Sequence, residues 1–191
     1  MKKLLLVLIS TYLISCGKTE EFSDATVEGL AELPAGAIKE PYDDNPDMIK
    51  VTIERATGNG EGDYLNGKKT GTWTEYHQTG LVKTIATYVD GIQQGLFTEI
   101  DDRGQLQRIS YYHNGQLHGA WKQFNRARIK EERNYVNGKL EGTSRVYYDT
   151  GEIMEEGAYT NGVRDGVSKW YDNEGNISIE YEYSAGELVN K

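Results

Sequence analysis

The sequence predicts an all-β fold, an elongated single-layer antiparallel sheet of tandem β-hairpins. Three observations predict this fold class. The 191 residues include 22 Gly and 14 Tyr but only 3 Phe and 3 Pro, a composition that suits short strands, tight turns and amphipathic aromatic packing. A Tyr-x-[Asn/Asp/Ala]-Gly motif recurs at steps of 23 or 24 residues. Between these motifs, apolar and polar residues alternate with a period of two.

The repeated unit sets the extent of the predicted domain. A strand-like pattern at residues 51–53 precedes the first copy, so we place the repeat domain at residues 49–191. A unit of this length is too short to bury an apolar face alone, so each hairpin should depend on its neighbours. The copies start near residues 64, 88, 112, 135, 159 and 183, at the motif tyrosines Tyr64, Tyr88, Tyr112, Tyr135, Tyr159 and Tyr183.

Each copy is expected to contain two strands joined by polar turns. The first strand follows the second glycine of the copy, as at residues 72–76, and ends at turn residues such as 101–104. Asp and Asn bond to their own backbone in such turns, and Gly supplies positive φ. The third copy is one residue short and lacks the turn glycine at residues 125–128. This irregularity should loosen or reshape its hairpin.

The period of two in the second strands predicts which side chains share a face. An aliphatic residue stands six positions before each motif tyrosine from Tyr88 onward, which is an even step. These aliphatic residues are Val82, Leu106, Ile129, Ile153 and Ile177, and we expect them on the face of the tyrosines. The first strands add an aromatic column at Tyr76, Phe124, Tyr147 and Tyr171, with Ile100 substituting in the second copy.

The repeated motif resembles a known family. Tyr-x-Asn-Gly-x-x-x-Gly-x-Trp-x-x-Tyr stands at residues 64–76 and, with Phe for the last Tyr, at residues 112–124. This pattern is similar to the MORN repeat in its bacterial variant, over about residues 64–191. The resemblance implies an elongated meander of hairpins without an enclosed core. Ser144 and Ser168 depart from it, because they stand where Trp or Phe belongs.

Stacked copies should present ladders of aromatic side chains, and exposed aromatic ladders are typical of contact surfaces. The alternative left open is that the tyrosines only pack on one another as a thin structural layer. The candidate binding surface consists of Tyr64, Trp73, Tyr76, Tyr88, Phe97, Tyr112, Trp121, Phe124, Tyr135, Tyr147, Tyr159, Tyr171 and Tyr183.

The N-terminus has the features of a lipoprotein signal peptide, predicted at residues 1–15. Two lysines precede an apolar run at residues 4–14, which is too short to span a bilayer but suits a signal peptide. The run ends in Leu-Ile-Ser-Cys at residues 13–16, which resembles the bacterial lipobox and implies acylation of Cys16. Gly17 stands where an Asp would retain the protein in the inner membrane. We therefore expect a lipid-anchored envelope protein of the outer membrane, on its periplasmic or surface side.

Residues 16–48 are predicted to form a disordered acidic tether, because they lack a sustained apolar period and contain all three prolines of the chain. One stretch of this tether imitates a calcium-binding loop by its spacing. Position 6 of the imitation is Met48 instead of Gly, and Pro46 occupies position 4, so we interpret it as linker acidity rather than a calcium site. The imitating residues are Asp43, Asn45, Asp47 and Glu54.

No catalytic or metal-binding pattern stands out, so we predict a protein that is not an enzyme and has no metal and no cofactor. His113 and His118 flank one turn while His77 lies two repeats away, and two imidazoles make a poor zinc site. Paired carboxylates such as Glu131 and Glu132 point to opposite faces of a strand. No nucleophile elbow or phosphate-binding glycine loop is present.

The function indicated is binding, with two hypotheses; a third, an enzyme with an undetected site, would be revealed by activity of the purified domain. The first is a protein-binding scaffold, since bacterial proteins with this repeat variant are often classed as antitoxin or immunity-type proteins. The net charge of −9 disfavours nucleic acid and suits a basic, toxin-like partner. The second is a glycan-binding or adhesion module, in which Trp73 and Trp121 would stack on sugar rings.

Overall fold

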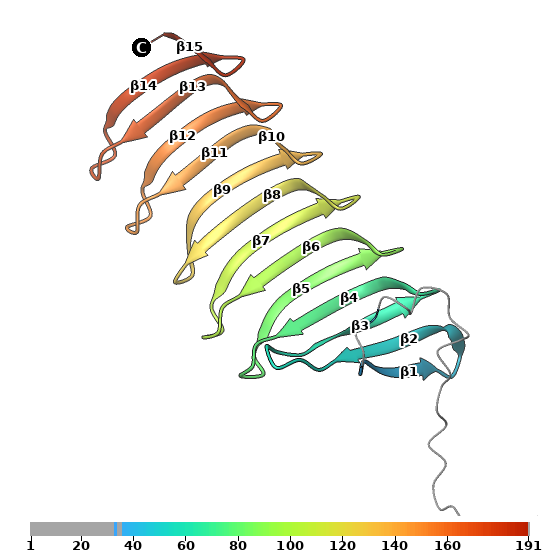
Figure 1. Ribbon diagram of the computed structural model, residues 1–191. Helices are drawn as coiled ribbons and strands as arrows, with labels where there is room; N and C mark the ends of the chain where they lie inside the picture. The colour runs from blue at the N-terminus through green and yellow to red at the C-terminus, as the bar shows by residue number, and fades with distance from the viewer. Residues whose placement is uncertain (1–32, 34–35, 191) are drawn as a thin grey trace, which may run out of the picture.

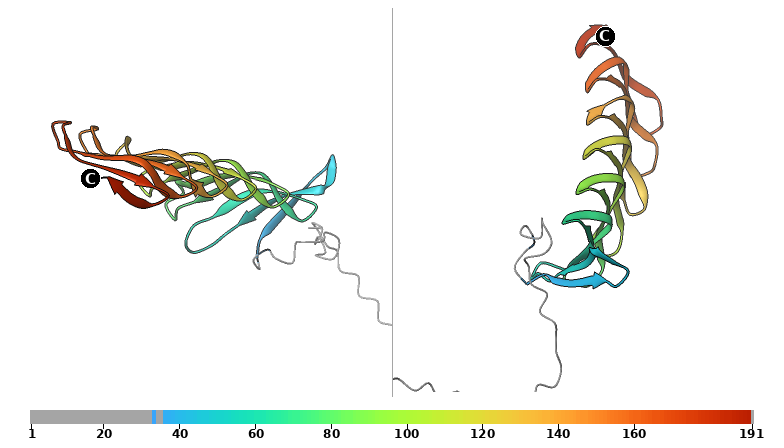
Figure 2. Two further views of the ribbon diagram at one scale, coloured as in Figure 1. Left: turned by 90° about the horizontal axis from the view of Figure 1, so that it is seen from above. Right: turned by 90° about the vertical axis from the view of Figure 1, so that its right-hand side faces the viewer.

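The computed structural model describes residue 33 and residues 36–190, and it confirms the predicted fold class. These residues form one open antiparallel sheet of 15 strands and contain no helix (Figure 1). Two turned views show the sheet as a single, elongated, twisted layer (Figure 2). Each strand pairs with its neighbours in chain order, except that the short β10 pairs only with β9. The predicted signal peptide and Cys16 lie outside the described residues.

The strands have the following bounds: β1 Ile38–Tyr42, β2 Asn45–Ile53, β3 Gly60–Leu65, β4 Lys68–Tyr76, β5 Val82–Val89, β6 Ile92–Ile100, β7 Leu106–His113, β8 Gln116–Asn125, β9 Arg128–Val136, β10 Lys139–Leu140, β11 Gly142–Tyr147, β12 Ile153–Thr160, β13 Val163–Tyr171, β14 Ile177–Ser184 and β15 Glu187–Asn190.

The motif turns form one long edge of the sheet. Their two central residues both have positive φ, as at Asn66 (51°) and Gly67 (75°), which is the geometry that matches the twist of a hairpin and favours Asn-Gly. Each turn also bonds to the preceding repeat, because the Gly91 N–H donates to the Lys69 carbonyl at 2.8 Å. The glycine turns therefore close hairpins and join successive copies.

The turns at the other edge of the sheet explain why the predicted face of the aliphatic residues was wrong. Tyr76 pairs with Val82, but Glu75 pairs with Thr84, so two residues of β5 stand opposite one of β4. Such a β-bulge breaks the alternation of side chains. Val82 therefore lies on the face opposite Tyr88, although the even spacing predicted a shared face. The same register shift displaces Leu106, Ile129, Ile153 and Ile177.

The N-terminal end of the sheet corrects two further expectations. The tether was predicted to continue to residue 48, but β1 and β2 already begin at residues 38 and 45. A small core also exists here, although the resemblance implied none; it consists of Ile49, Val51, Ile53, Tyr64 and Trp73, with Leu33, Ala37 and Tyr88 packed against it. The sequence signal was the apolar alternation at residues 49–53, which continues the pattern we assigned only to residues 51–53.

The calcium-like spacing does not form a loop. Asn45 and Asp47 lie in β2, and Glu54 follows the far end of that nine-residue strand. An extended strand separates these oxygens, whereas a calcium loop curls its ligands around one ion.

The irregular third copy is reshaped rather than loosened. Arg126 and Ala127 form a two-residue turn with φ of 49° and 66°, and Asn125 pairs with Arg128. The adjoining strands β8 and β9 are among the longest of the sheet, at 10 and 9 residues. The missing residue is therefore absorbed by a tighter turn.

Candidate binding surfaces

The predicted aromatic surface is divided between the two faces of the sheet. We call the first the tyrosine face; it carries Tyr64, Trp73, Tyr88, Phe97, Tyr112, Trp121, Tyr135, Tyr159 and Tyr183. The other face, which we call the ladder face, carries Tyr76, Phe124, Tyr147 and Tyr171. The bulges and turns decide this division, so the predicted residues form two separate surfaces.

Large and small residues alternate across the tyrosine face. The strand register places Trp73, Ala86, Phe97, Ser110 and Trp121 in one row. The small residues give the large rings room, and Ala86 and Ser110 are buried between them. Interdigitation of this kind is what close packing requires.

Gly62 begins this row and shows how tightly the rings lie. A Cβ atom at Gly62 would stand only 2.6 Å from the indole of Trp73. The absence of a side chain at this position is therefore what lets the Trp73 ring lie against β3.

The chain's own cations cover the rings of the tyrosine face. The ammonium of Lys69 lies 4.1 Å from the centroid of the Trp73 ring, and the guanidinium of Arg133 lies 5.2 Å from that of Trp121. Arg108 covers Phe97 in the same way, at 4.8 Å. Trp73 is itself only 4% exposed. Burial lowers the pKa of Lys69, as expected for an ammonium removed from water.

One of the two serines that depart from the repeat motif, Ser168, is compensated by an arginine. Ser168 is fully buried, and its Oγ accepts a hydrogen bond from Nη1 of Arg164 at 2.7 Å. The same guanidinium pairs with Glu155 and lies 5.2 Å from the ring of Trp170. Trp170 stands two residues after Ser168 and so lies on the same face. The tryptophan is thus displaced along the strand rather than lost.

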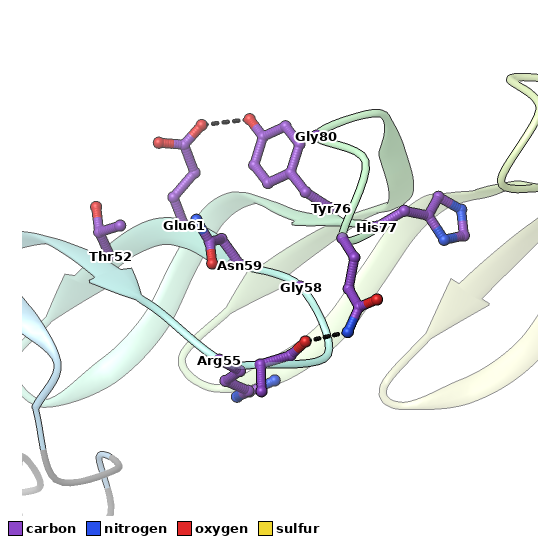
Figure 3. A pocket seen from close by; sticks show the side chains of 11 residues that line it. Thr52, Arg55, Gly58, Asn59, Glu61, Tyr76, His77 and Gly80 are labelled. Atoms are coloured by element: carbon purple, nitrogen blue, oxygen red, sulfur yellow. Dashed lines mark hydrogen bonds between the residues drawn. The ribbon is translucent and has the colours of Figure 1, made fainter.

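A cavity of about 550 Å³ lies at the edge of the sheet between the β2–β3 loop and the β4–β5 turn (Figure 3). The phenol of Tyr76 donates to Oε1 of Glu61 at 2.5 Å, and the Gln78 amide donates to the Ala56 carbonyl. His77 bonds through Nε2 to the Ile100 carbonyl at 2.9 Å. These hydrogen bonds of Tyr76, Gln78 and His77 hold the loop and the turn in place. None of them joins a nucleophile to a general base.

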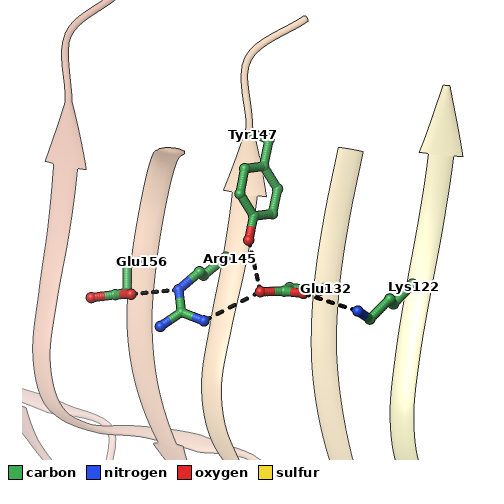
Figure 4. A network of polar contacts seen from close by, with 5 residues as sticks. All are labelled: Lys122, Glu132, Arg145, Tyr147 and Glu156. Carbon is green, nitrogen blue, oxygen red and sulfur yellow. Dashed lines mark hydrogen bonds and ion pairs between the residues drawn. The ribbon is translucent and has the colours of Figure 1, made fainter. Parts of the chain in front are cut away.

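A row of alternating charges crosses the ladder face from β8 to β14. The register aligns Lys122, Glu132, Arg145, Glu156, Lys169 and Glu180, and we call this row the charge ladder. Arg145 lies between two carboxylates, at 3.2 Å from Glu132 and 2.6 Å from Glu156 (Figure 4). Lys122 approaches Glu132 at 3.6 Å, and Lys169 approaches Glu180 at 3.7 Å.

The phenol of Tyr147 completes the charge ladder by donating to Oε1 of Glu132 at 2.7 Å (Figure 4). That hydrogen bond, with help from Arg145, lowers the pKa of Glu132. Burial, followed by the bond to Glu132, raises the pKa of Tyr147 to about 12. Glu132 is therefore ionised and Tyr147 is neutral across the neutral pH range.

The sequence analysis missed an apolar patch on the ladder face of β5–β7. The register pairs Val89 with Ile92 and Leu96 with Tyr111, and all four side chains are 43–55% exposed. We call these four residues the apolar patch. A signal existed in the sequence, because Val89 and Tyr111 stand next to motif tyrosines and therefore point to the other face.

The histidines do not form a three-ligand group. The rings of His113 and His118 lie 5.5 Å apart between centroids, beside Gln94 and Asn137, and His77 is remote. Within residue 33 and residues 36–190, no cluster of three or more His, Cys, Asp or Glu could hold a metal ion. The same described part has no helix with the length and apolar character that crossing a membrane requires.

Comparison with known proteins supports the repeat assignment. A family model described as the MORN repeat variant matches residues 69–90, 140–161 and 164–185. Three segments of this chain thus match the MORN repeat variant. The matched segments include both serine-bearing copies, so those departures do not remove them from the MORN pattern.

Other comparisons add little about function. No curated protein matches the chain. Two crystal structures of TarM, one of an S. aureus mutant in complex with fondaparinux, alpha-GlcNAc-glycerol and UDP, are 9% identical, with TM-scores of 0.27 and 0.26. Each alignment covers 74% of this chain and 21% of TarM, so the chain spans about a fifth of that protein. Neither fold nor function follows from these values.

Proposed function

We propose that this chain is a non-enzymatic lipoprotein of the cell envelope whose MORN-repeat sheet is a scaffold for a protein partner. The observation that carries the proposal is the apolar patch of Val89, Ile92, Leu96 and Tyr111, because contiguous exposed apolar side chains are characteristic of protein contact sites. The half-buried Ile85 and Ile109 extend it across the same strands.

The proposed partner is a basic protein, because the chain carries a net charge of −9 and complementary charge speeds and selects association. An immunity-type role, in which the scaffold neutralises a basic toxin domain, fits this chemistry. The proposed lipid anchor at Cys16 would place such a role at the envelope, on the outer membrane. The rings of Trp73 and Trp121 carry cations of the same chain, so they lack the free face that stacking on a sugar requires.

The binding proposal is tested by capture from envelope extracts with the full-length chain. Replacing Leu96 and Tyr111 by Ser should reduce capture of the partner by at least tenfold and leave the thermal midpoint nearly unchanged. The matched control is Ile179→Ser, because Ile179 is also 44% exposed but lies on the tyrosine face. Equal capture by the double variant and the wild type would sink the proposal.

The tyrosine face stays a competing prediction for the contact surface. Replacing Tyr112 and Tyr135 by Ser tests it, since both tyrosines belong to the sequence-based candidate set and lie outside the apolar patch. We expect this variant to lose stability and to retain capture whenever it is folded. Loss of capture in a folded Tyr112→Ser, Tyr135→Ser protein would move the interface to the tyrosine face.

The anchoring proposal has a separate test. Cys16→Ser removes the acylated side chain, so the protein should leave the membrane fraction and should not incorporate a labelled fatty acid. If the Cys16→Ser protein stayed in the membrane fraction, its membrane association would not depend on acylation, and this result would contradict the lipoprotein assignment.

A further inference from the structure

The charge ladder is complementary to itself. Its order from β8 to β14 is Lys122, Glu132, Arg145, Glu156, Lys169 and Glu180, which is an even number of strictly alternating charges. Reversing an even alternating row exchanges every cation for an anion. A two-fold axis parallel to the strands reverses the strand order in this way.

We propose that the ladder face of β8–β14 binds a second copy of this chain about such an axis, which passes between β11 and β12. Arg145 then faces Glu156 of the second copy, Glu132 faces its Lys169, and Lys122 faces its Glu180. This is an isologous interface, the commonest kind in homodimers. The inference goes beyond the proposed partner binding and does not depend on it.

An apolar column beside the ladder supplies area for this contact. Cross-strand pairs form it, with Phe124 opposite Ile129, Tyr147 opposite Ile153, and Tyr171 opposite Ile177. A two-fold axis parallel to the strands keeps each column in its place along the strand, so the apolar column of one copy meets that of the other. Ile177 is 51% exposed, and burying it removes apolar surface from water.

The size of the contact suits a reversible dimer. Six strands spaced about 4.8 Å apart, over roughly 20 Å of strand length, give roughly 600 Å² per copy. The total of about 1,200 Å² is at the lower end of specific interfaces. Two sheets that pack face to face in this way are a common arrangement of β-structure.

The ladder decides which dimer forms rather than supplying most of its affinity. Its side chains are 22–51% exposed and already paired within one copy, so additional pairing across the interface is worth little. Wrong arrangements are penalised, because an axis shifted onto β11 places Arg145 against Arg145 and Glu132 against Glu156. An axis perpendicular to the strands places each charge against itself. Contact between like charges destabilises both of these alternative arrangements.

Three members of the apolar patch, Val89, Ile92 and Leu96 on β5 and β6, lie outside the proposed overlap, whereas β7 with Tyr111 faces the short β15 of the second copy. The two activities are therefore separable by mutation on β5 and β6.

The test uses two full-length copies with different affinity tags, expressed together. Wild-type copies should capture one another. Arg145→Glu should reduce capture of itself by at least tenfold, because the introduced carboxylate then faces Glu156, and Glu156→Arg should do the same. Coexpression of the Arg145→Glu chain with the Glu156→Arg chain should restore capture, since every facing pair is again opposite in charge.

A third variant keeps the test valid if a charge reversal disturbs folding. Ile177→Asp changes an exposed side chain of the apolar column, so it should fold normally by circular dichroism and lose capture. Arg103→Glu, in a solvated turn, is the control and should retain capture. The dimer is refuted if wild-type copies do not capture one another, or if the folded Ile177→Asp chain captures a second copy as well as the wild type does. It is also refuted if the Arg145→Glu and Glu156→Arg chains capture each other no better than each captures itself.

Discussion

Different residues fill the tyrosine face at the two ends of the sheet. Near β2–β4, Ile49, Val51 and Ile53 form a buried core with Tyr64 and Trp73. Near β11–β14, the corresponding row contains only small residues, Ser144, Gly157 and Ser168, before it reaches Tyr181. Arg164 fills that space by bonding to Ser168 and Glu155 beneath three aromatic rings.

The comparison teaches that a MORN-type repeat needs a filled volume at this row rather than a particular side chain. An aromatic ring fills it in the first three copies, at Trp73, Phe97 and Trp121. A planar guanidinium with fixed hydrogen bonds fills it in the fifth, where a Cβ on Gly157 would stand 3.0 Å from Nη1 of Arg164. The first solution is held by burial of apolar area and the second by charge-assisted bonds. The two ends should therefore respond differently to mutation and pH.

The largest expected effect is at the apolar end. Trp73→Ala should lower the free energy of unfolding by about 3–5 kcal/mol, because it opens a cavity against Tyr64 and Gly62. Trp121→Ala should cost less than about 3 kcal/mol, since Trp121 is only half-buried. Urea denaturation gives both values. Equal costs would show that the core end is no better packed than the middle of the sheet.

Removing the arginine should have the next largest effect. Arg164→Ala should cost about 2–3 kcal/mol, because it leaves Glu155 and Ser168 without their partner. Arg164→Lys should recover only part of this, since an ammonium cannot reproduce the planar fork. Hydrogen exchange should place the loss of protection in β12–β14. A loss spread evenly over all strands would contradict two separately stabilised ends.

Two buried serines give a matched pair in the same row. Ser168→Ala removes the acceptor of the Arg164 bond and should cost about 1–2 kcal/mol. Ser110 is equally buried, but its Oγ has no hydrogen-bond partner within residues 36–190. Ser110→Ala should therefore be neutral or stabilise by up to about 1 kcal/mol. Thermal melts should give a lower midpoint for Ser168→Ala and an unchanged or higher midpoint for Ser110→Ala.

The smallest effect expected is a pH dependence at β9 and β11 on the ladder face, where Tyr147 donates to Glu132. The pKa of Tyr147 is raised to about 12, so its stabilisation is complete below pH 10 and is lost as pH rises toward 12. The pKa of Glu132 is lowered, so its contribution is present above about pH 4.5 and is lost on acidification. Tyr147→Phe should make the alkaline loss of stability shallower. An unchanged alkaline slope in urea titrations would disprove this role.

Much of the candidate surface could be located in the sequence only as residue types. The motif predicted that tyrosines would recur along the sheet, and the structure places all six on one face. The column of Tyr76, Phe124, Tyr147 and Tyr171 was also correct as a column, but spacing could not assign its face. The apolar patch was missed because its members occupy variable positions of the repeat and become neighbours only through strand pairing.

The sequence by itself determined the repeat length, the turn positions and the hairpin order, since Asn-Gly turns and a period of two are local properties of the chain. Only the tertiary structure decided which side chains share a face and which neighbours fill the row beside Ser168. One bulged residue inverts the side of a strand, and register across strands is set by packing between copies rather than within one. Arg164 lies over rings from β12, β13 and β14 at once, and no single repeat encodes that cluster.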